Sequence, residues 1–374
     1  MNGDNRYTTE IIRDPNGLSA LGPAWDALFE RALRPQVGQS FEWVSCVWET
    51  IMKPRGARLH ILVLREGTRP VLIWPLVVLQ HRRFWRAVHP LIMDSYHDVL
   101  VELSPAAGDL AALAVRMLRK NRGHDLLVTD WVRADSVIEG ALSAVPAMDT
   151  KVDYSVEWNG LADWAAYERG VSTRQSIHRR LRRLRERGRV AFELIEDPDR
   201  QRTLIAWLIR RKLDRLSVQG TEPLWEGGSM ENFIATASRR VSRFGTLLFF
   251  ALTLNDETIA AQIAVQDTNR LVALQIAHEP KFEKYGPGIL IAQQFLHWAF
   301  DRRLPVELGW GDSSFKKTLR NREDKISTRI LPTSVWGGVR MEIRRLRGWQ
   351  GQWLATRKLG EARGLERNEG PGPA

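Results

Sequence analysis

Between residues 278 and 288 the chain reads His278-Glu279-Pro280-Lys281-Phe282-Glu283-Lys284-Tyr285-Gly286-Pro287-Gly288, and an apolar segment, residues 289–301, follows. Apolar residues in that segment recur with helical spacing, so the pattern predicts a helix. Pro287 suits a first helical turn, where no N–H is needed, and the two glycines leave the backbone bare. Such a helix begins with unpaired N–H groups and the positive end of its dipole, a combination that binds phosphate. A tight helix start without a ligand is the alternative that the motif leaves open.

The segments around this glycine loop (residues 278–288) predict alternating strands and helices. Upstream, three β-rich runs separated by turn-forming residues predict an antiparallel meander over 246–254, 258–266 and 271–277. Helices are expected over 172–187, 198–217 and 230–244, with a strand over 190–196. Downstream we expect a short strand at 306–308, a polar loop over 309–321 and a last strand at 328–332.

The length of 374 residues favours two domains or halves, because single hydrophobic cores usually stop growing below this size. Residues 145–153 contain a proline and two aspartates and are the best candidate joint. We therefore expect one half at 1–150, a second at 151–338, and a basic helix with a frayed tail at 339–374. The first half predicts helices at 18–31, 41–51 and 106–120 and strands at 59–65, 71–79, 97–103 and 125–130.

The net charge of +11 is concentrated in two places. Residues 174–189 hold eight arginines and one acid, and residues 339–374 hold eight basic residues and four acids. Such local concentrations of positive charge favour an anionic partner: a phosphate group, an acidic polymer, nucleic acid or a membrane surface. The basic helix expected at 339–359 could lie on a membrane or dock on its own domain.

Composition excludes several classes of protein. The single cysteine, Cys46, excludes a disulfide scaffold and a cysteine-rich zinc site. The first residues lack the apolar core of a signal peptide, and the longest apolar runs are about half as long as a membrane-spanning helix. We expect a cytoplasmic protein with a possible association with the membrane surface.

A meander followed by a glycine-opened helix and one more strand resembles the acyl-CoA core of the GNAT N-acyltransferases. Three further motifs resemble the CelD/BioF2-like acetyltransferase family, relatives of the FemAB transferases: Ser172-Thr173-Arg174 with its arginine-rich helix, Ile259-Ala260-Ala261-Gln262, and Trp310-Gly311-Asp312 with Phe315-Lys316-Lys317. The resemblance covers most of the second half, and the first half matches loosely as a degenerate GNAT-like module. It implies an α/β (α+β) fold of tandem GNAT-like halves, each a mixed, mainly antiparallel sheet flanked by helices.

The resemblance also implies acetyl-CoA, or another acyl-CoA, as co-substrate and no metal. The residues expected to bind it are Lys284, Tyr285, Gly286, Pro287, Gly288 and Ile289. The usual GNAT phosphate loop has Gln or Arg three residues before its first glycine, where this chain has Glu283. The charge partners of the phosphates must therefore come from elsewhere, and Lys281, Lys284 and the arginine-rich helix are the candidates.

Acyl transfer from a thioester to an amine or hydroxyl needs aligned substrates, donors for the developing oxyanion, and a base. Backbone N–H groups beside a bulge in the meander could be those donors. Candidate acids and bases are Glu279, His278, Asp312 and Tyr285, and in GNAT relatives a tyrosine protonates the leaving thiolate. An ordinary solvated or capping role is the alternative for each.

Four residues are candidates for binding the second substrate: Arg174, Arg180, Gln262 and Lys316. Lys316 belongs to a Phe-Lys-Lys that resembles the family's aromatic-Lys motif, and an ordinary surface lysine is the alternative. The resemblance implies an N- or O-acetyltransferase acting on a bacterial exopolysaccharide or its lipid-linked precursor. A FemAB-like aminoacyltransferase using aminoacyl-tRNA and a catalytically silent scaffold that binds an anionic glycan or RNA remain as rival hypotheses.

Overall fold

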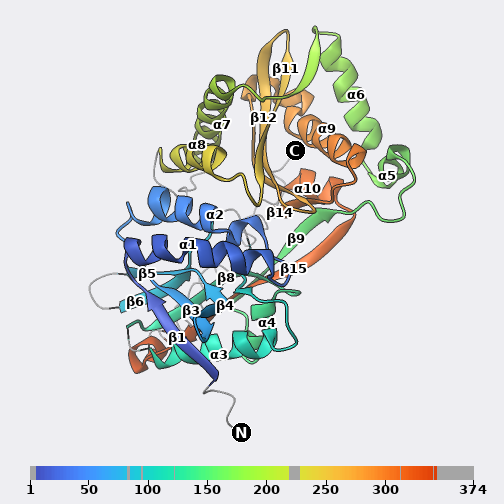
Figure 1. The fold of residues 1–374 in the computed structure, drawn as a ribbon. Helices are drawn as coiled ribbons and strands as arrows, with labels where there is room; N and C mark the ends of the chain where they lie inside the picture. Colours follow the sequence, from blue (N-terminus) through green and yellow to red (C-terminus); the bar gives the residue numbers. More distant parts are fainter. Residues whose placement is uncertain are drawn as a thin grey trace, which may run out of the picture.

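The computed structural model describes residues 6–81, 85–93, 96–121, 123–218, 228–311, 313–339 and 341–342. Its described elements form two halves, each with strands flanked by helices (Figure 1). The α/β class and the mainly antiparallel sheets expected from the sequence are confirmed. Of the basic segment expected at 339–374, nearly all lies outside the described residues.

The first half contains most of the short strands. Its elements are β1 (Tyr7–Ile12), α1 (Pro15–Glu30), η2 (Val37–Gln39), α2 (Phe41–Val47), η3 (Trp48–Met52), β2 (Arg58–Leu59), β3 (Ile61–Glu66), β4 (Arg69–Trp74), β5 (Leu76–His81), β6 (Trp85–Pro90), β7 (Leu100–Val101), α3 (Ala107–Lys120), β8 (Leu126–Arg133) and α4 (Val137–Leu142). Strands β1, β3, β4 and β7 form a separate antiparallel sheet in the order β1-β3-β4-β7.

The second half is built around the predicted meander. Its elements are β9 (Asp149–Val156), α5 (Trp164–Gly170), α6 (Arg174–Arg185), β10 (Val190–Leu194), α7 (Pro198–Val218), α8 (Ser229–Arg240), β11 (Thr246–Leu254), β12 (Glu257–Gln266), β13 (Leu271–His278), η4 (Pro280–Tyr285), α9 (Pro287–Asp301), β14 (Val306–Trp310), α10 (Ser314–Leu319) and β15 (Arg322–Pro332). The meander strands β11, β12 and β13 end within one residue of the predicted bounds.

The two halves repeat one unit, a strand, a helix and a second strand parallel to the first. In the second half β13 leads through α9 to β14, and β13 and β14 pair in parallel. In the first half β6 leads through the short strand β7 and α3 to β8, and β6 and β8 also pair in parallel. A parallel connection needs a crossover of this length, usually a helix, so the repeat agrees with the expected tandem arrangement.

Strands β9 and β15 are exchanged relative to the strands that they follow in the chain. Strand β9 follows β8 in the chain but pairs with β14, whereas β15 follows β14 but pairs with β8. The exchanged strands also pair with each other, antiparallel, in the middle of the molecule. The result is one sheet of eleven strands in the order β10-β11-β12-β13-β14-β9-β15-β8-β6-β5-β2.

Helices cover both faces of the second half's strands. On one face α7 and α8 pack with Phe249 and Ile263 in a core cluster that also includes Trp25 and Trp43 of the first half. On the other face α9 packs against Phe250, and α6 adds Ile177 and Leu184 to the same cluster. Alternate residues of β11 therefore point to different cores, as strand geometry requires.

Four predicted elements need correction. The strand expected at 97–103 is only two residues long, Leu100–Val101, because only these two residues pair with β4. The single strand expected at 71–79 is two strands, β4 and β5, in different sheets, because Pro75 between them lacks an N–H for a ladder. The loop expected at 309–321 contains α10, a helix of six residues. The last strand begins at Arg322, well before residue 328. Its first four residues, 322–325, are charged, so the sequence pattern did not predict a strand there, but they pair with β9.

Candidate active site

The glycine loop connects the end of β13 to the start of α9. Gly286 has φ 61° and ψ 50°, a left-handed conformation that favours glycine, and Pro287 occupies the first turn of α9 as predicted. The Gly286 N–H donates to the Glu283 carbonyl oxygen at 2.8 Å. No side chain caps α9 at this described N-terminus. The first N–H groups of α9 can therefore donate to an anion.

Arg180 of α6 lies directly beside Gly286. A Cβ atom at position 286 would come within 2.3 Å of Arg180 Nη1, so the guanidinium occupies the space that a side chain would need. Among the described residues no carboxylate pairs with Arg180. A cation thus lies at the positive end of a helix, and a bound anion would be attracted to both.

His278 lies on the other side of the loop, near Gly288. A Cβ atom at position 288 would lie 3.3 Å from His278 Nδ1, so the imidazole faces the first turn of α9. Burial lowers the pKa of His278 below its usual value. The ring is therefore mostly neutral at pH 7.

The other residues expected to bind acyl-CoA lie close by, with different surroundings. The Lys284 ammonium lies 5.2 Å from the centre of the Tyr285 ring, and Tyr285 and Ile289 pack partly against the α9 core cluster. Lys281 forms an ion pair with Glu257, which makes it less available as a phosphate partner. Arg180, by contrast, lies directly beside Gly286 and is available as a charge partner for the loop.

A buried carboxylate, Glu168 of α5, joins α6 to α9. Its Oε1 atom accepts a hydrogen bond from Gln293 Nε2 of α9 at 2.8 Å and lies 2.9 Å from His178 Nε2 of α6. Its Oε2 atom lies 3.7 Å from Arg174 Nε. Arg174, predicted to bind substrate, is therefore engaged in an ion pair within the protein.

Two further predicted residues lie on or just after the strands that precede the loop. Glu279 Oε2 pairs with Arg211 Nη2 of α7 at 2.7 Å, and the Glu279 side chain is 15% exposed. Gln262 is buried on β12, opposite Ile276 of β13, and its Oε1 atom has no hydrogen-bond partner among the described residues. Both residues lie near the C-terminal end of β13, as expected.

Strands β13 and β14 separate soon after they begin to pair. They pair only at Leu271 with Val306 and at Val272 with Glu307. The β12–β13 ladder shifts register between Ile263 and Ala264, which confirms a bulge in the meander. Backbone groups of β13 beyond Val272 are therefore not bonded to β14, although the two strands are neighbours in the sheet.

Lys316 of α10 lies at the C-terminal end of β14. Its Nζ atom donates to the Trp310 carbonyl oxygen at 2.8 Å. The Trp310 ring stacks on Trp131 of the first half with 4.9 Å between centroids. Asp312, a predicted base, lies outside the described residues.

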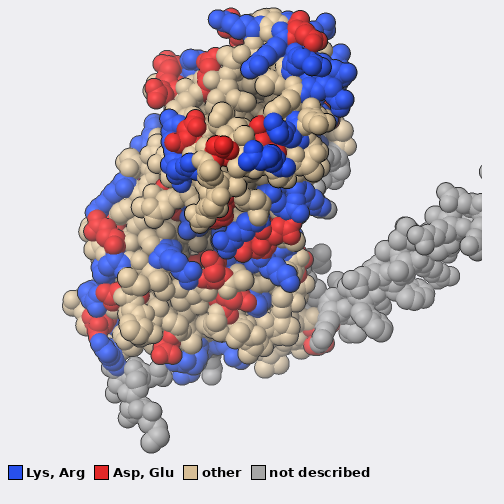
Figure 2. All heavy atoms as spheres, turned by 90° about the vertical axis from the view of Figure 1, so that its right-hand side faces the viewer, with Lys and Arg blue, Asp and Glu red and all other residues tan. Residues whose placement is uncertain are grey.

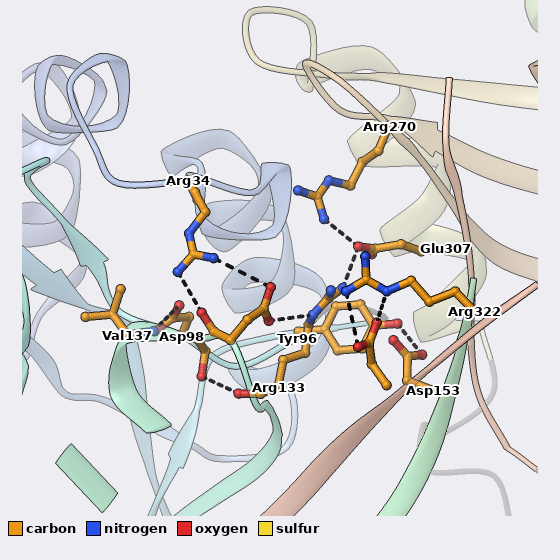
Figure 3. A network of polar contacts seen from close by, with 12 residues as sticks. Arg34, Tyr96, Asp98, Arg133, Val137, Asp153, Arg270, Glu307 and Arg322 are labelled. Atoms are coloured by element: carbon orange, nitrogen blue, oxygen red, sulfur yellow. Dashed lines mark hydrogen bonds and ion pairs between the residues drawn. The ribbon is translucent and has the colours of Figure 1, made fainter. Parts of the chain in front are cut away.

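A buried polar network between the halves was not predicted (Figure 3). Glu307 Oε1 of β14 accepts hydrogen bonds from Arg133 Nη1 of β8 and Arg270 Nη1, each at 2.6 Å. The Arg133 guanidinium also lies 5.1 Å from the Tyr96 ring centre. The sequence feature that could have predicted this network is the glutamate inside the predicted strand 306–308, because a charged residue in a buried strand requires a partner.

Asp153 of β9 is the second carboxylate of this network. The Tyr96 hydroxyl donates to Asp153 Oδ1 at 2.6 Å, and the residue is only 2% exposed. Burial raises the pKa of Asp153 to about 6. Because β9 pairs Asp153 with Trp310, this carboxyl group lies beside the end of β14.

The exposed face of α6 forms a basic surface of the second half. Figure 2 shows Lys and Arg side chains gathered at the end of the molecule where α6 lies. The exposed arginines of α6 and of the two residues after it are Arg179, Arg182, Arg183, Arg185 and Arg187. Within the described ranges, no set of three or more His, Cys, Asp and Glu residues is arranged to hold a metal, and no helix has the length and apolarity to cross a membrane.

The comparison with protein families identifies the second half. Residues 171–317 match the family described as an acetyltransferase (GNAT) domain. The second half therefore contains a GNAT-type acetyltransferase domain, and the expected acyltransferase class is confirmed at this level. No curated protein matches the chain by sequence. The narrower CelD/BioF2-like assignment stays a prediction.

Solved structures resemble nearly the whole chain. FemX is 11% identical with a TM-score of 0.55, over 84% of this chain and 96% of its own. The C-terminal domain of a putative lysylphosphatidylglycerol synthetase from Agrobacterium fabrum is 9% identical with a TM-score of 0.53, over 87% and 95%. A conserved protein of unknown function from Bacteroides thetaiotaomicron is 12% identical with a TM-score of 0.52, over 86% and 100%. At such low identity these likenesses establish the fold.

Proposed function

We propose that the GNAT-type domain of this protein transfers an acyl group, most simply acetyl, from a CoA thioester to an amine or hydroxyl. The observation that carries the proposal is the juxtaposition of three features: the left-handed Gly286, the uncapped start of α9 and the Arg180 guanidinium beside them. Together they provide N–H donors and a positive charge at a point where the backbone is bare. A diphosphate is the group of CoA that fits this chemistry.

In this proposal each residue of the loop has a defined task. The N–H groups of Gly288 and Ile289 donate to the phosphate oxygens, and Arg180 neutralises their charge. Pro287 starts the helix without an N–H of its own, and the half-buried Tyr285 with Lys284 borders the site. Gln262, whose buried Oε1 atom has no partner among the described residues, offers an acceptor to the bound substrate.

The transfer itself needs a base and an acid. The nucleophile loses a proton to the base, attacks the thioester carbonyl carbon, and the carbon–sulfur bond breaks as the thiolate is protonated. We assign the base to Glu279, directly or through water, because it lies at the end of β13 next to the loop, with Asp312 and His278 as the other candidates. Tyr285 is assigned the protonation of the thiolate. Unpaired N–H groups of β13 near the bulge stabilise the oxyanion.

The acceptor in this proposal is a bacterial exopolysaccharide or its lipid-linked precursor, which is what the CelD/BioF2-like resemblance implies. Lys316, held at the end of β14, and Trp310 lie where an acceptor would approach from the first half. The reaction would take place in the cytoplasm, where acyl-CoA is available, at the inner surface of the membrane if the precursor is lipid-linked.

Calorimetric titration with CoA and with pantetheine tests the anion site, because pantetheine lacks the diphosphate. We expect CoA to bind and pantetheine to bind at least about tenfold more weakly, given two or more charge-assisted hydrogen bonds. Equal affinity would place the binding energy elsewhere. Release of free thiol from acetyl-CoA in the presence of amine-bearing oligosaccharides then tests the transfer.

A FemAB-like aminoacyltransferase is the second candidate, favoured by the five exposed arginines of the α6 surface. Such a surface would bind tRNA with a strong salt dependence. Exchange of Arg182 and Arg183 for glutamine should then weaken tRNA binding and reduce its salt slope by about two. A catalytically silent scaffold would instead bind an anionic glycan or RNA and release no thiol from acetyl-CoA with any acceptor.

A further inference from the structure

Glu168 is a buried acid that the proposed chemistry does not use. Only 8% of the residue is exposed, and its carboxylate has partners on two other helices. We call Glu168, Arg174, His178 and Gln293 the Glu168 cluster. Removing a carboxylate from water is costly, so a buried one requires several partners to remain charged.

The cluster connects α6 to α9 through a single carboxylate. Arg174 and His178 are four residues apart and therefore lie on one flank of α6, both toward Glu168. Gln293 lies in the second turn of α9 and donates to the same Oε1 atom that His178 contacts. One carboxylate thus fixes the position of both helices.

Helix α6 has little else to hold it. Among its twelve residues only Ile177 and Leu184 are buried, and α6 packs against η4 and α9. Its Arg180 guanidinium lies beside Gly286, at the positive end of α9, and these two positive charges repel each other until an anion binds. The Glu168 carboxylate contacts Arg174 and His178 of the same helix and so adds a fixed negative charge that holds α6 in place.

We propose that Glu168 is a positioning residue for the anion site: it holds α6 so that Arg180 lies beside Gly286. The inference rests on the proposed function, since Arg180 is there to meet the diphosphate of acyl-CoA. Glu168 itself lies in α5 and contacts Gln293 in the second turn of α9, so it acts through Arg180 and not on the ligand.

The test is a double-mutant cycle with CoA as the probe, measured by calorimetry on the full chain. We expect Arg180→Ala to weaken CoA binding about 10- to 100-fold, because a charge-assisted hydrogen bond is lost. Glu168→Gln should weaken it about three- to tenfold, since the amide keeps an acceptor for Gln293 but loses its charge. The double variant should bind no more weakly than Arg180→Ala alone.

Glu139→Gln is the matched control. Glu139 is a partly buried acid of the first half that accepts a hydrogen bond from Arg329 Nη2 at 2.6 Å. It should lower stability without changing the Kd for CoA, which separates a structural effect from a positioning effect. If Glu168→Gln does not fold, Gln293→Leu removes the tie from the α9 side and should weaken CoA binding in the same direction.

The outcomes separate the two proposals. Additive effects of Glu168→Gln and Arg180→Ala, or an unchanged Kd in both Glu168→Gln and Gln293→Leu, would overturn the positioning role while leaving the anion site intact. A wild-type protein that binds no CoA would overturn the proposed function, and the positioning role with it.

Discussion

At Gly286 both the backbone conformation and the proposed anion site require a residue without a Cβ atom. Its left-handed φ of 61° costs a non-glycine residue about 1–2 kcal/mol, and a Cβ atom there would collide with Arg180. We predict that Gly286→Ala lowers the free energy of unfolding by about that amount and weakens CoA binding at least about tenfold, because Arg180 must move.

Gly160→Ala is the control for this prediction. Gly160 has φ 76° with open space around its Cβ position, so alanine there costs similar backbone energy without touching the site. Urea unfolding and calorimetry on both variants make the comparison. A Kd for CoA that changes equally in the two would show that backbone strain, and not the loss of Arg180, is responsible.

Buried histidines make the first half sensitive to acid. Burial lowers the pKa of His60 to about 3 and that of His124 to about 4, and their rings lie 5.5 Å apart. Both His124 ring nitrogens lack hydrogen-bond partners among the described residues. The unfolded chain binds these protons first, so stability is lost as the pH falls from the unfolded pKa near 6.5 toward 4.

We predict that His124→Leu loses about 2 kcal/mol less stability than the wild type between pH 8 and pH 5, because one protonation that favours unfolding is removed. Urea denaturation at the two pH values measures this difference. Parallel losses in both proteins would mean that His124 is not the buried neutral group that its surroundings require.

Helix α7 and strand β13 meet through two polar contacts. Arg211 pairs with Glu279 at 2.7 Å, and the Lys212 ammonium donates to Gln275 in the interior of the strand. The first contact holds the proposed base at the end of its strand, next to the glycine loop. The position of the base is therefore set by α7 and β13 together, although Glu279 itself lies just after the strand.

We predict that Glu279→Gln keeps the fold and the affinity for CoA but slows acyl transfer at least about 100-fold, the scale of a lost general base. Initial rates of thiol release, compared with the Kd for CoA, measure the two effects separately. Turnover equal to that of the wild type would remove Glu279 from the mechanism and leave Asp312 and His278 as the candidates.

The exchange of β9 and β15 ties the two halves into one folding unit. Strand β15 completes the sheet of the first half against β8, and β9 completes that of the second half against β14. The halves also share a core cluster that contains Trp43 of the first half and Phe233 of the second, with ring centroids 5.2 Å apart. Neither half is closed without the other.

We predict that residues 1–147 and 148–374, produced separately, show no cooperative unfolding, because each exposes an unpaired strand edge and part of a core. Produced together, they should associate and bind CoA. Thermal unfolding followed by circular dichroism measures both cases. A sharp transition for an isolated half would show that the exchanged strands are dispensable.

Much of the second half was predictable because its signals are local. The turns at 255–257 and 267–270 delimit the meander strands, and Gly286-Pro287-Gly288 predicts the start of α9. The charged start of β15 and the polar partners of Glu307 were missed, since a charged residue in a strand is recognised as buried only when its distant partner is known.

Features that depend on neighbours along the chain could be predicted from the sequence directly. They are the helical periodicity, the turn residues and the bare backbone where an anion can approach. Tertiary structure alone decided which of eight clustered arginines lies beside Gly286, which helix Glu168 secures, and how β9 and β15 change places. Those outcomes depend on distances between residues that are 100 or more positions apart. Such distances are set by packing of the whole molecule, which no local pattern encodes.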